Sequence, residues 1–325
     1  MSEPFPASWY ARLTSFEPPR GLEAPPDWEA AVQLLAEHGL ASIAAYNLQY
    51  RMPEVQAPEL AKDVLLGYYQ GVVNDNVYKL VTLKQALSHV RGPSVVLLDA
   101  AAFSDTIYPH VAFRPVPELK LLVREAELDE VVTGLRETEF LPVDDADPDP
   151  ESPRVTLYNR RFHLRLFTTL LPQQREEAGL FGRIVKARPY GTNAFRPSAE
   201  DALLLHVLSQ ARAGFVLPLI SWIDLRELVR GVAVPAERGG PGAPIDPVVV
   251  KGRAKAFGVE RPLHVALELL RFFHPELDDA ARALSPDLGL ATRTALDAAV
   301  VGPAKNPLRD AQRAGVGKLV QILLG

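Results

Sequence analysis

Apolar residues recur at intervals of three and four over the first quarter of the chain, which is the spacing of one helical face. This spacing predicts helices over Asp27–His38, Glu59–Val73 and Asn74–Val90. Asp27 is suited to cap the first of them, and Gly92 and Pro93 interrupt the pattern after the third. We therefore expect an N-terminal helical region over residues 1–92.

The pattern changes after Pro93, where short apolar runs rich in β-branched residues alternate with amphipathic segments. The expected strands are Ser94–Leu98, Glu118–Val123, Glu139–Val143, Arg154–Tyr158 and Arg161–Thr169, and the expected helices are Ala100–Tyr108 and Glu127–Thr138. The last two strands would form a hairpin that turns at Asn159, and the acidic, proline-broken segment Asp144–Ser152 predicts a loop. Residues 93–172 are thus predicted to form a small α/β core of four or five strands.

The rest of the chain, residues 173–325, is predicted to be a C-terminal helical domain. A possible capping box at Ser198–Asp201 precedes the first helix. The expected helices are Ala202–Ala213, Pro218–Arg230, Val248–Phe257, Leu263–Phe273, Asp278–Ala283, Ala291–Val300 and Leu308–Leu324. Apolar side chains within 248–273 and 308–324 either fill the core or contact a partner. The fold class is α+β, with a small mixed sheet flanked by helical regions.

Composition narrows the function classes. The 325 residues are 47% hydrophobic and 23% charged, as in ordinary globular proteins, and contain no cysteine, which excludes disulfides, thiolate metal sites and a thiol nucleophile. A net charge of −5 gives no general attraction for nucleic acid or an anionic membrane. The chain contains no apolar run long enough for a transmembrane helix, and its N-terminus lacks signal-peptide features, so we expect a soluble cytoplasmic protein.

Four short motifs follow one another along the chain. They are Leu98-Asp99-Ala100-Ala101-Ala102-Phe103, then Tyr108-Pro109, then Arg114-Pro115-Val116-Pro117-Glu118-Leu119-Lys120-Leu121-Leu122-Val123, and finally Arg196-Pro197-Ser198-Ala199-Glu200-Asp201-Ala202-Leu203-Leu204-Leu205-His206. In order and spacing they resemble the uncharacterised nucleotidyltransferase family, within the polymerase-beta-like superfamily, over residues 28–275.

The resemblance implies a metal-dependent nucleotidyl transfer in active members, whose Asp-x-Asp pair holds a divalent cation on the triphosphate. Here that pair is replaced by Glu118 and Lys120, and the lysine ahead of the first core helix is replaced by Asp99. A third carboxylate is expected on the hairpin strand, where this chain has Arg160–Arg165, with His163 within it. The family's catalytic positions are therefore degenerate, and the sequence indicates a pseudoenzyme without cofactor.

The resemblance implies that Asp99 and Lys120 lie at the ends of neighbouring strands, as in the family fold, where they either form an ion pair in place of metal and phosphate or each face solvent. The leading hypothesis is a catalytically inactive nucleotidyltransferase-like protein that acts as a binding or scaffolding partner for an unknown protein. In one alternative, Glu118 with Asp99 holds Mg²⁺ and NTP in an active enzyme. In another, the protein binds nucleotide or RNA without metal.

Basic side chains concentrate around the hairpin, at Arg160, Arg161, Arg165, Arg183, Lys186 and Arg188. Arg161 and Arg165, together with Arg114, are candidates for binding phosphate or another anion. These basic side chains could instead form a solvent-exposed face whose positive charge balances the negative charge of the acidic loop. The seven histidines form no pair three or four residues apart, which favours packing roles over a zinc site, with His206 in the core.

Overall fold

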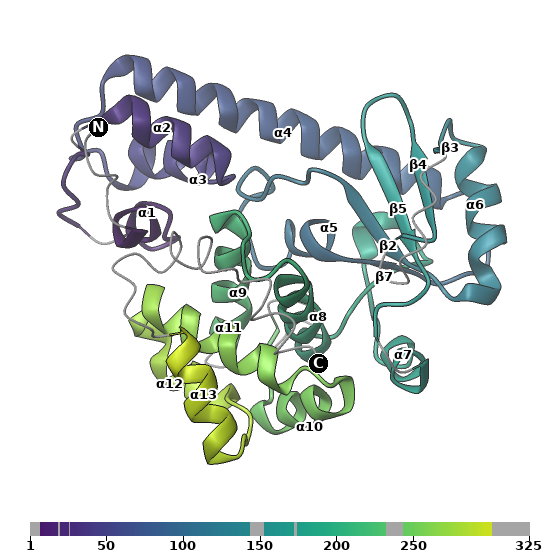
Figure 1. Ribbon diagram of the computed structural model, residues 1–325. Helices are drawn as coiled ribbons and strands as arrows, with labels where there is room; N and C mark the ends of the chain where they lie inside the picture. The colour runs from purple at the N-terminus through teal and green to yellow at the C-terminus, as the bar shows by residue number, and fades with distance from the viewer. Residues whose placement is uncertain are drawn as a thin grey trace. The chain divides into compact units, whose positions relative to one another are not determined.

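The computed structural model describes residues 7–18, 20–25, 27–143, 153–171, 174–231 and 243–300 (Figure 1). The chain divides into two compact units. The first consists of residues 1–169 and 186–196, and the second of residues 170–185 and 197–325. The expected loop Asp144–Ser152 and the expected helix Leu308–Leu324 lie outside the described residues.

The first unit contains a seven-stranded mixed sheet with strand order β3-β4-β5-β2-β1-β7-β6. The strands are β1 (Val95–Leu97), β2 (Leu119–Leu122), β3 (Leu141–Val143), β4 (Val155–Tyr158), β5 (His163–Phe167), β6 (Val185–Lys186) and β7 (Ala194–Arg196). β1 pairs with β2 antiparallel and with β7 parallel, and β2 pairs with β5 parallel. The inner strand β1 is fully buried at all three residues.

The five strands predicted from apolar runs are present, and their observed bounds are shorter than expected. β6 and β7 were missed because two or three residues are too short to show an alternating pattern. The hairpin turns at Asn159 as predicted, since the Asn159 side chain accepts hydrogen bonds from the backbone N–H groups of Arg161 and Phe162. The mixed α/β class predicted from the sequence is confirmed.

The first unit also contains several helices and helical turns. They are α1 (Ala7–Leu13), α2 (Trp28–Glu37), α3 (Ala41–Tyr46), the π-helical turn Asn47–Arg51, α4 (Glu59–Leu87), α5 (Asp99–Phe103), α6 (Leu128–Arg136) and two 3₁₀ turns, Glu125–Glu127 and Arg188–Tyr190. Asp27 caps α2 as predicted, because its side chain accepts a hydrogen bond from the Ala30 N–H at 3.1 Å.

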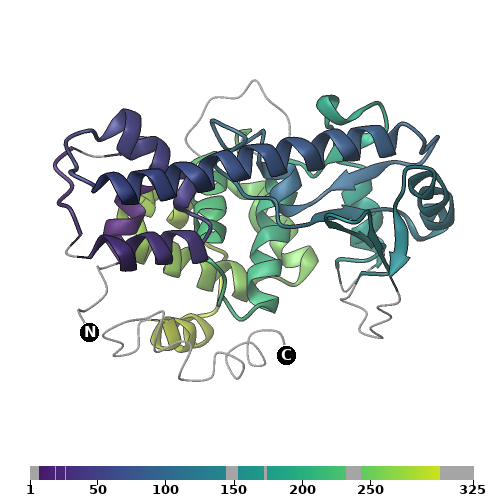
Figure 2. The ribbon, with the colours of Figure 1, turned by 90° about the horizontal axis from the view of Figure 1, so that it is seen from above.

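The two helices expected over residues 59–90 are one helix, α4, of 29 residues. Asn74, which was expected to begin a second helix, lies in the interior of α4, where neither glycine nor proline breaks the backbone hydrogen bonds. One part of α4 packs against α2 and α3, and another part packs against α6 and the turn at 188–190. Figure 2 shows α4 extending from those N-terminal helices to the sheet.

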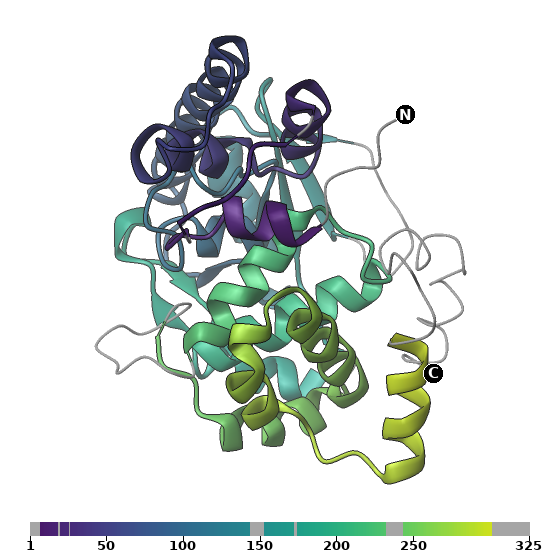
Figure 3. The ribbon, with the colours of Figure 1, turned by 90° about the vertical axis from the view of Figure 1, so that its left-hand side faces the viewer.

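The second unit is helical. It contains α7 (Gln174–Phe181), α8 (Ala199–Arg212), α9 (Leu219–Arg230), α10 (Pro247–Phe257), α11 (Glu260–Phe273), the 3₁₀ turn Pro275–Leu277, α12 (Asp278–Leu284) and α13 (Leu290–Val300). Ser198 caps α8 as predicted, and His206 is buried with its Nε2 2.9 Å from the Ser221 carbonyl oxygen. In Figure 3, α13 is the yellow helix that follows the connection at 285–289. Within the described part of the chain, no helix combines the length and the apolar character needed to cross a membrane.

Two glycine-to-alanine substitutions in helices test the packing of α6, and they should change the free energy of unfolding in opposite directions. A Cβ at Gly134 in α6 would lie 2.9 Å from the His89 carbonyl oxygen and 3.0 Å from Val90 Cγ2, whereas a Cβ at Gly71 in α4 would meet nothing within 4 Å. Gly134→Ala should lower the free energy of unfolding by about 1–2 kcal/mol, because backbone must move to admit the methyl group. Gly71→Ala should raise it by about 0.5–1 kcal/mol through helix propensity alone. Urea denaturation measures both, and a stabilising Gly134→Ala would contradict the close approach of α6 to residues 89–90.

Candidate functional site

Four charged side chains come together where β1, β2 and β5 lie side by side in the first unit. Lys120 of β2 is directly opposite Arg165 of β5 in the parallel register, so both side chains lie on the same face of the sheet. Glu118 directly precedes β2 and is two residues from Lys120, which places it on that face as well. Asp99 begins α5 at the end of β1, the other neighbour of β2.

These side chains form a chain of alternating charges that we call the Asp99–Arg165 network. Lys120 Nζ lies 2.9 Å from Asp99 Oδ2 and 3.6 Å from Glu118 Oε1. Arg165 Nε lies 2.9 Å from Glu118 Oε2. Glu118 therefore separates two cations that the strand register places side by side. Of the two alternatives left open by the sequence, the ion pair of Asp99 with Lys120 is confirmed.

The backbone at Asp99 adopts a conformation that favours this contact. Its φ is +47°, in the left-handed region that aspartate and asparagine tolerate better than most residues. The preceding residue is fixed by a hydrogen bond from the Leu98 N–H to the Lys120 carbonyl oxygen at 3.0 Å. Main-chain pairing of the strands and side-chain pairing of the charges therefore fix the same two residues.

Partial burial makes the ion pair stronger than an ordinary surface contact. The side chains of Asp99 and Lys120 are each 29% exposed, and that of Glu118 is 24% exposed. The negative charge of Asp99 raises the pKa of Lys120 above its ordinary value of 10.5, although burial of the ammonium opposes that rise. The Glu118 charge raises the Lys120 pKa further, and Arg165 lowers it. Lys120 is therefore held as a cation throughout the neutral range.

Two buried polar residues of α4 position the segment that leads into this site. Asn76 Nδ2 donates hydrogen bonds to the carbonyl oxygens of Val111 and Arg114, both at 2.7 Å, and Asn76 Oδ1 accepts one from the Val116 N–H at 3.0 Å. Lys79 Nζ donates to the Val116 carbonyl oxygen at 2.7 Å and pairs with Asp75. These contacts fix the backbone two residues before Glu118. The sequence analysis did not single out Asn76 or Lys79. The pattern that indicates them is a pair of polar side chains three residues apart on the apolar face of a helix.

The three candidate anion-binding arginines each make a contact within the first unit. Arg114 Nη1 donates to the Pro115 carbonyl oxygen at 2.7 Å, and the Arg161 guanidinium lies 4.0 Å from the centre of the Tyr78 ring. Arg165 pairs with Glu118, as described above. His163 is exposed and packs on the Tyr158 ring with 4.8 Å between ring centres. The structure brings Arg165 into the network but places Arg161 and His163 outside it, and anion binding stays a prediction.

Other members of the basic concentration also have partners. Arg183 Nε lies 2.9 Å from Asp201 Oδ2 in the second unit. Lys186 in the first unit lies 4.0 Å from the centre of the Phe195 ring. Asp201, which belongs to the fourth motif, is fully buried, so this part of the motif supports the helical packing around α8.

The residues in the network do not fit the divalent cation that the family implies. Such a cation takes oxygen ligands from carboxylates that converge on one point. Here Asp99 and Glu118 do converge, but the point is occupied by the Lys120 ammonium, which cannot ligate a metal. Arg165, which pairs with Glu118, adds a second positive charge. No metal-dependent step can be derived from this arrangement.

Charge reversal tests the contribution of the ion pair to stability. Lys120→Asp places a third anion beside Asp99 and Glu118, and in EDTA it should lower Tm by about 3–8 °C, between the effects of surface and buried pairs. The double change Asp99→Lys with Lys120→Asp should recover much of that loss, though lysine tolerates the left-handed backbone at 99 less well than aspartate. Differential scanning calorimetry measures both. Shifts below about 2 °C in both variants would show that the two residues are independent surface groups.

The raised pKa of Lys120 also predicts a dependence on pH. A group whose pKa is higher in the folded than in the unfolded protein stabilises the fold. This stabilisation is complete at pH values below the unfolded-state pKa, and it is lost as the pH rises through the folded-state pKa. The difference in free energy of unfolding between the natural protein and Lys120→Gln should therefore be constant near neutrality and shrink above pH 10.5. Lys62→Gln, at an exposed pair with Glu59, is the control that should change little at any pH. Urea denaturation across this pH range measures both variants. A difference in free energy of unfolding between the natural protein and Lys120→Gln that grew above pH 10.5 would contradict the account.

Comparison with known proteins supports the resemblance found in the motifs. The model of the uncharacterised nucleotidyltransferase family matches residues 24–274, a range that contains the whole sheet and the helices from α2 to α11. No curated protein and no solved structure matches the chain. Because the match covers well over half of the sequence and includes the Asp99–Arg165 network, the chain belongs to the uncharacterised nucleotidyltransferase family.

Proposed function

We propose that this protein is a catalytically inactive member of the family that acts as a binding or scaffolding partner. The observation that carries the proposal is the position of the Lys120 ammonium, 2.9 Å from Asp99 and 3.6 Å from Glu118. Two carboxylates that could together hold a metal instead hold a side-chain cation.

The charges of the network argue against nucleotidyl transfer. Transfer from a nucleoside triphosphate requires positive charge to neutralise the phosphates as the bond to the leaving group breaks. Asp99, Lys120, Glu118 and Arg165 carry two negative and two positive charges, which sum to zero. The network therefore has no excess positive charge for a triphosphate. Lys120 is already paired with Asp99, and Arg165 is already paired with Glu118.

The exposed side of α4 supports the binding role. Several of its apolar side chains are between 41% and 77% exposed, namely Leu60, Val64, Leu66, Tyr68, Val77 and Val81. Apolar side chains gathered on one exposed helix are typical of surfaces that contact other proteins. We therefore favour a protein partner over a nucleotide.

A second candidate function rests on the same approach of the Asp99 and Glu118 carboxylates to one point. If the Lys120 side chain turned away, Asp99 and Glu118 would face one another closely enough to hold a single Mg²⁺, and the protein would be an active nucleotidyltransferase with rearranged carboxylates. This candidate requires breaking the 2.9 Å ion pair and leaving Lys120 beside a divalent cation, which electrostatics disfavours. It remains the alternative that an activity assay must address.

The assay is incorporation of label from each of the four NTPs, with Mg²⁺ or Mn²⁺, into the protein itself and into a mixture of protein and RNA acceptors. We expect no incorporation above background. Glu118→Gln is the matched variant, and Glu125→Gln, which changes an exposed glutamate beyond β2, is its control. Incorporation that Glu118→Gln abolishes and Glu125→Gln preserves would overturn the proposal in favour of the active enzyme.

A further inference from the structure

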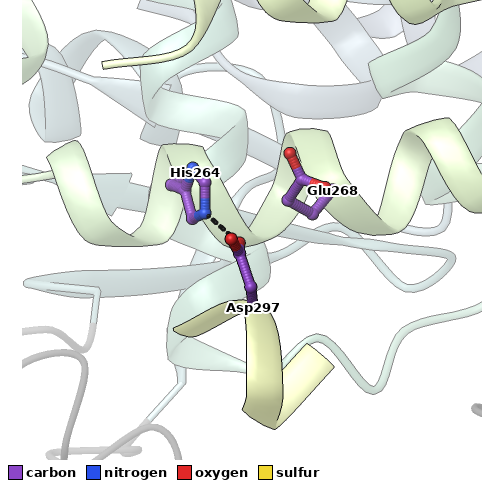
Figure 4. Close-up of side chains that lie close together, drawn as sticks. All are labelled: His264, Glu268 and Asp297. Carbon is purple, nitrogen blue, oxygen red and sulfur yellow. Dashed lines mark hydrogen bonds and ion pairs between the residues drawn. The ribbon is translucent and has the colours of Figure 1, made fainter. Parts of the chain in front are cut away.

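A cluster of three potential metal ligands lies in the second unit, separate in the sequence from the residues used above. His264 and Glu268 are one turn apart on α11, and Asp297 extends from α13 toward them (Figure 4). One ligand atom from each residue lies within 4.8 Å of the other two. A histidine and a carboxylate at i and i+4 present their ligand atoms on the same side of a helix.

The tightest contact of the cluster is a hydrogen bond between two potential ligand atoms. His264 is fully buried, and its Nε2 lies 2.7 Å from Asp297 Oδ1. Two ligands of a tetrahedral Zn²⁺, each about 2.0–2.2 Å from the ion, lie about 3.3–3.6 Å apart. A cation could therefore replace the hydrogen between these two atoms with a small outward movement of Asp297, which is 42% exposed and has Arg293 Nε 3.9 Å from its Oδ2.

We propose that His264, Glu268 and Asp297 form a binding site for a first-row divalent cation of the Zn²⁺ type. The ion takes Nε2 of His264 and one oxygen from each carboxylate, with water completing its coordination. This site is independent of the proposed function.

The ligand set selects the class of ion. An imidazole nitrogen with two carboxylates suits Zn²⁺ and its neighbours in the first transition row, whereas Mg²⁺ and Ca²⁺ prefer oxygen ligands alone. Cysteine is absent from the chain, so no thiolate site competes for the same ion. Mg²⁺ at a concentration similar to that of Zn²⁺ should not occupy the site.

Neighbouring side chains hold the ligands in place. The Ser285 hydroxyl lies 3.5 Å from His264 Nδ1, where it can orient the ring, as hydrogen bonds to the second nitrogen of metal-bound histidines do. Arg271 Nη1 lies 2.6 Å from Glu268 Oε1, so this contact engages one oxygen of that carboxylate and the ion would take Oε2. Arg271 also lowers the net negative charge of the cluster, which limits affinity.

Metal binding here would attach α13 to α11. Of the α13 side chains that the structure describes, only Leu296 is buried, and the adjacent Asp297 provides the contact to His264. Among its described side chains, α13 therefore buries little apolar surface against its neighbours. Coordination through Asp297 would add a further contact between α13 and α11.

The test is isothermal titration of the tag-free chain with ZnCl₂, without a histidine tag that would bind zinc itself. We expect one equivalent of Zn²⁺ to bind, and hydrogen exchange of the α13 amides to slow when it does. Asp297→Asn and Glu268→Gln should each weaken binding by at least about tenfold, since even the loss of an outer-shell partner costs 10–100-fold. Asp279→Asn, an exposed carboxylate on α12, is the matched control and should leave the affinity unchanged.

Both ligand variants change partly exposed side chains and should leave folding intact, whereas His264 is fully buried and is left unchanged. The proposal is overturned if Zn²⁺ fails to bind at one equivalent. It is also overturned if both variants bind as the natural protein does, which would place the ion on scattered surface groups, or if Mg²⁺ competes equally with Zn²⁺.

Discussion

The arrangement of the sheet's charged face depends on the ammonium of Lys120. The parallel register of β2 and β5 places Lys120 beside Arg165, and two adjacent cations would repel each other without anions between and around them. Glu118 lies between the two cations, and Asp99 balances Lys120 from the neighbouring strand end. The left-handed backbone at Asp99 and the Leu98–Lys120 main-chain hydrogen bond hold this geometry, and α4 braces the segment before Glu118 through Asn76 and Lys79. Removing any one of the four charged side chains would leave a partly buried charge without one of its counter-charges.

Belonging to the family and catalysing the family's implied reaction are separate questions for this chain. The family match rests on a frame of helices and strands that extends over residues 24–274. Under the proposed function, the reaction is lost through a few side chains at the ends of β1 and β2, where the family resemblance implies that lysine stands at a carboxylate position and aspartate at a lysine position. In the structure these two opposite charges lie 2.9 Å apart, so the fold is compatible with both exchanges.

Much of this could be predicted from the sequence, because it depends on local patterns and on motif order. Short apolar runs located β1 to β5, the cap at Asp27 located the start of α2, and the family resemblance placed Asp99 and Lys120 at neighbouring strand ends, with their pairing left open. What sequence patterns could not supply depends on distant contacts. β7 is only three residues long and is defined by its pairing with β1, and α4 continues through the expected break at Val73–Asn74 although Gly67 and Gly71 precede it. The bracing by Asn76 and Lys79, and the meeting of Asp297 with His264 across 33 residues, appear only once the helices are placed in space.

The most direct measurement of the central claim is a crystal structure of the protein soaked with Mn²⁺ and a non-hydrolysable NTP, recorded where manganese scatters anomalously. The account predicts Lys120 Nζ between Asp99 and Glu118, with no anomalous peak within bonding distance of either carboxylate. A manganese ion held by Asp99 and Glu118, with the Lys120 side chain turned away, would contradict it.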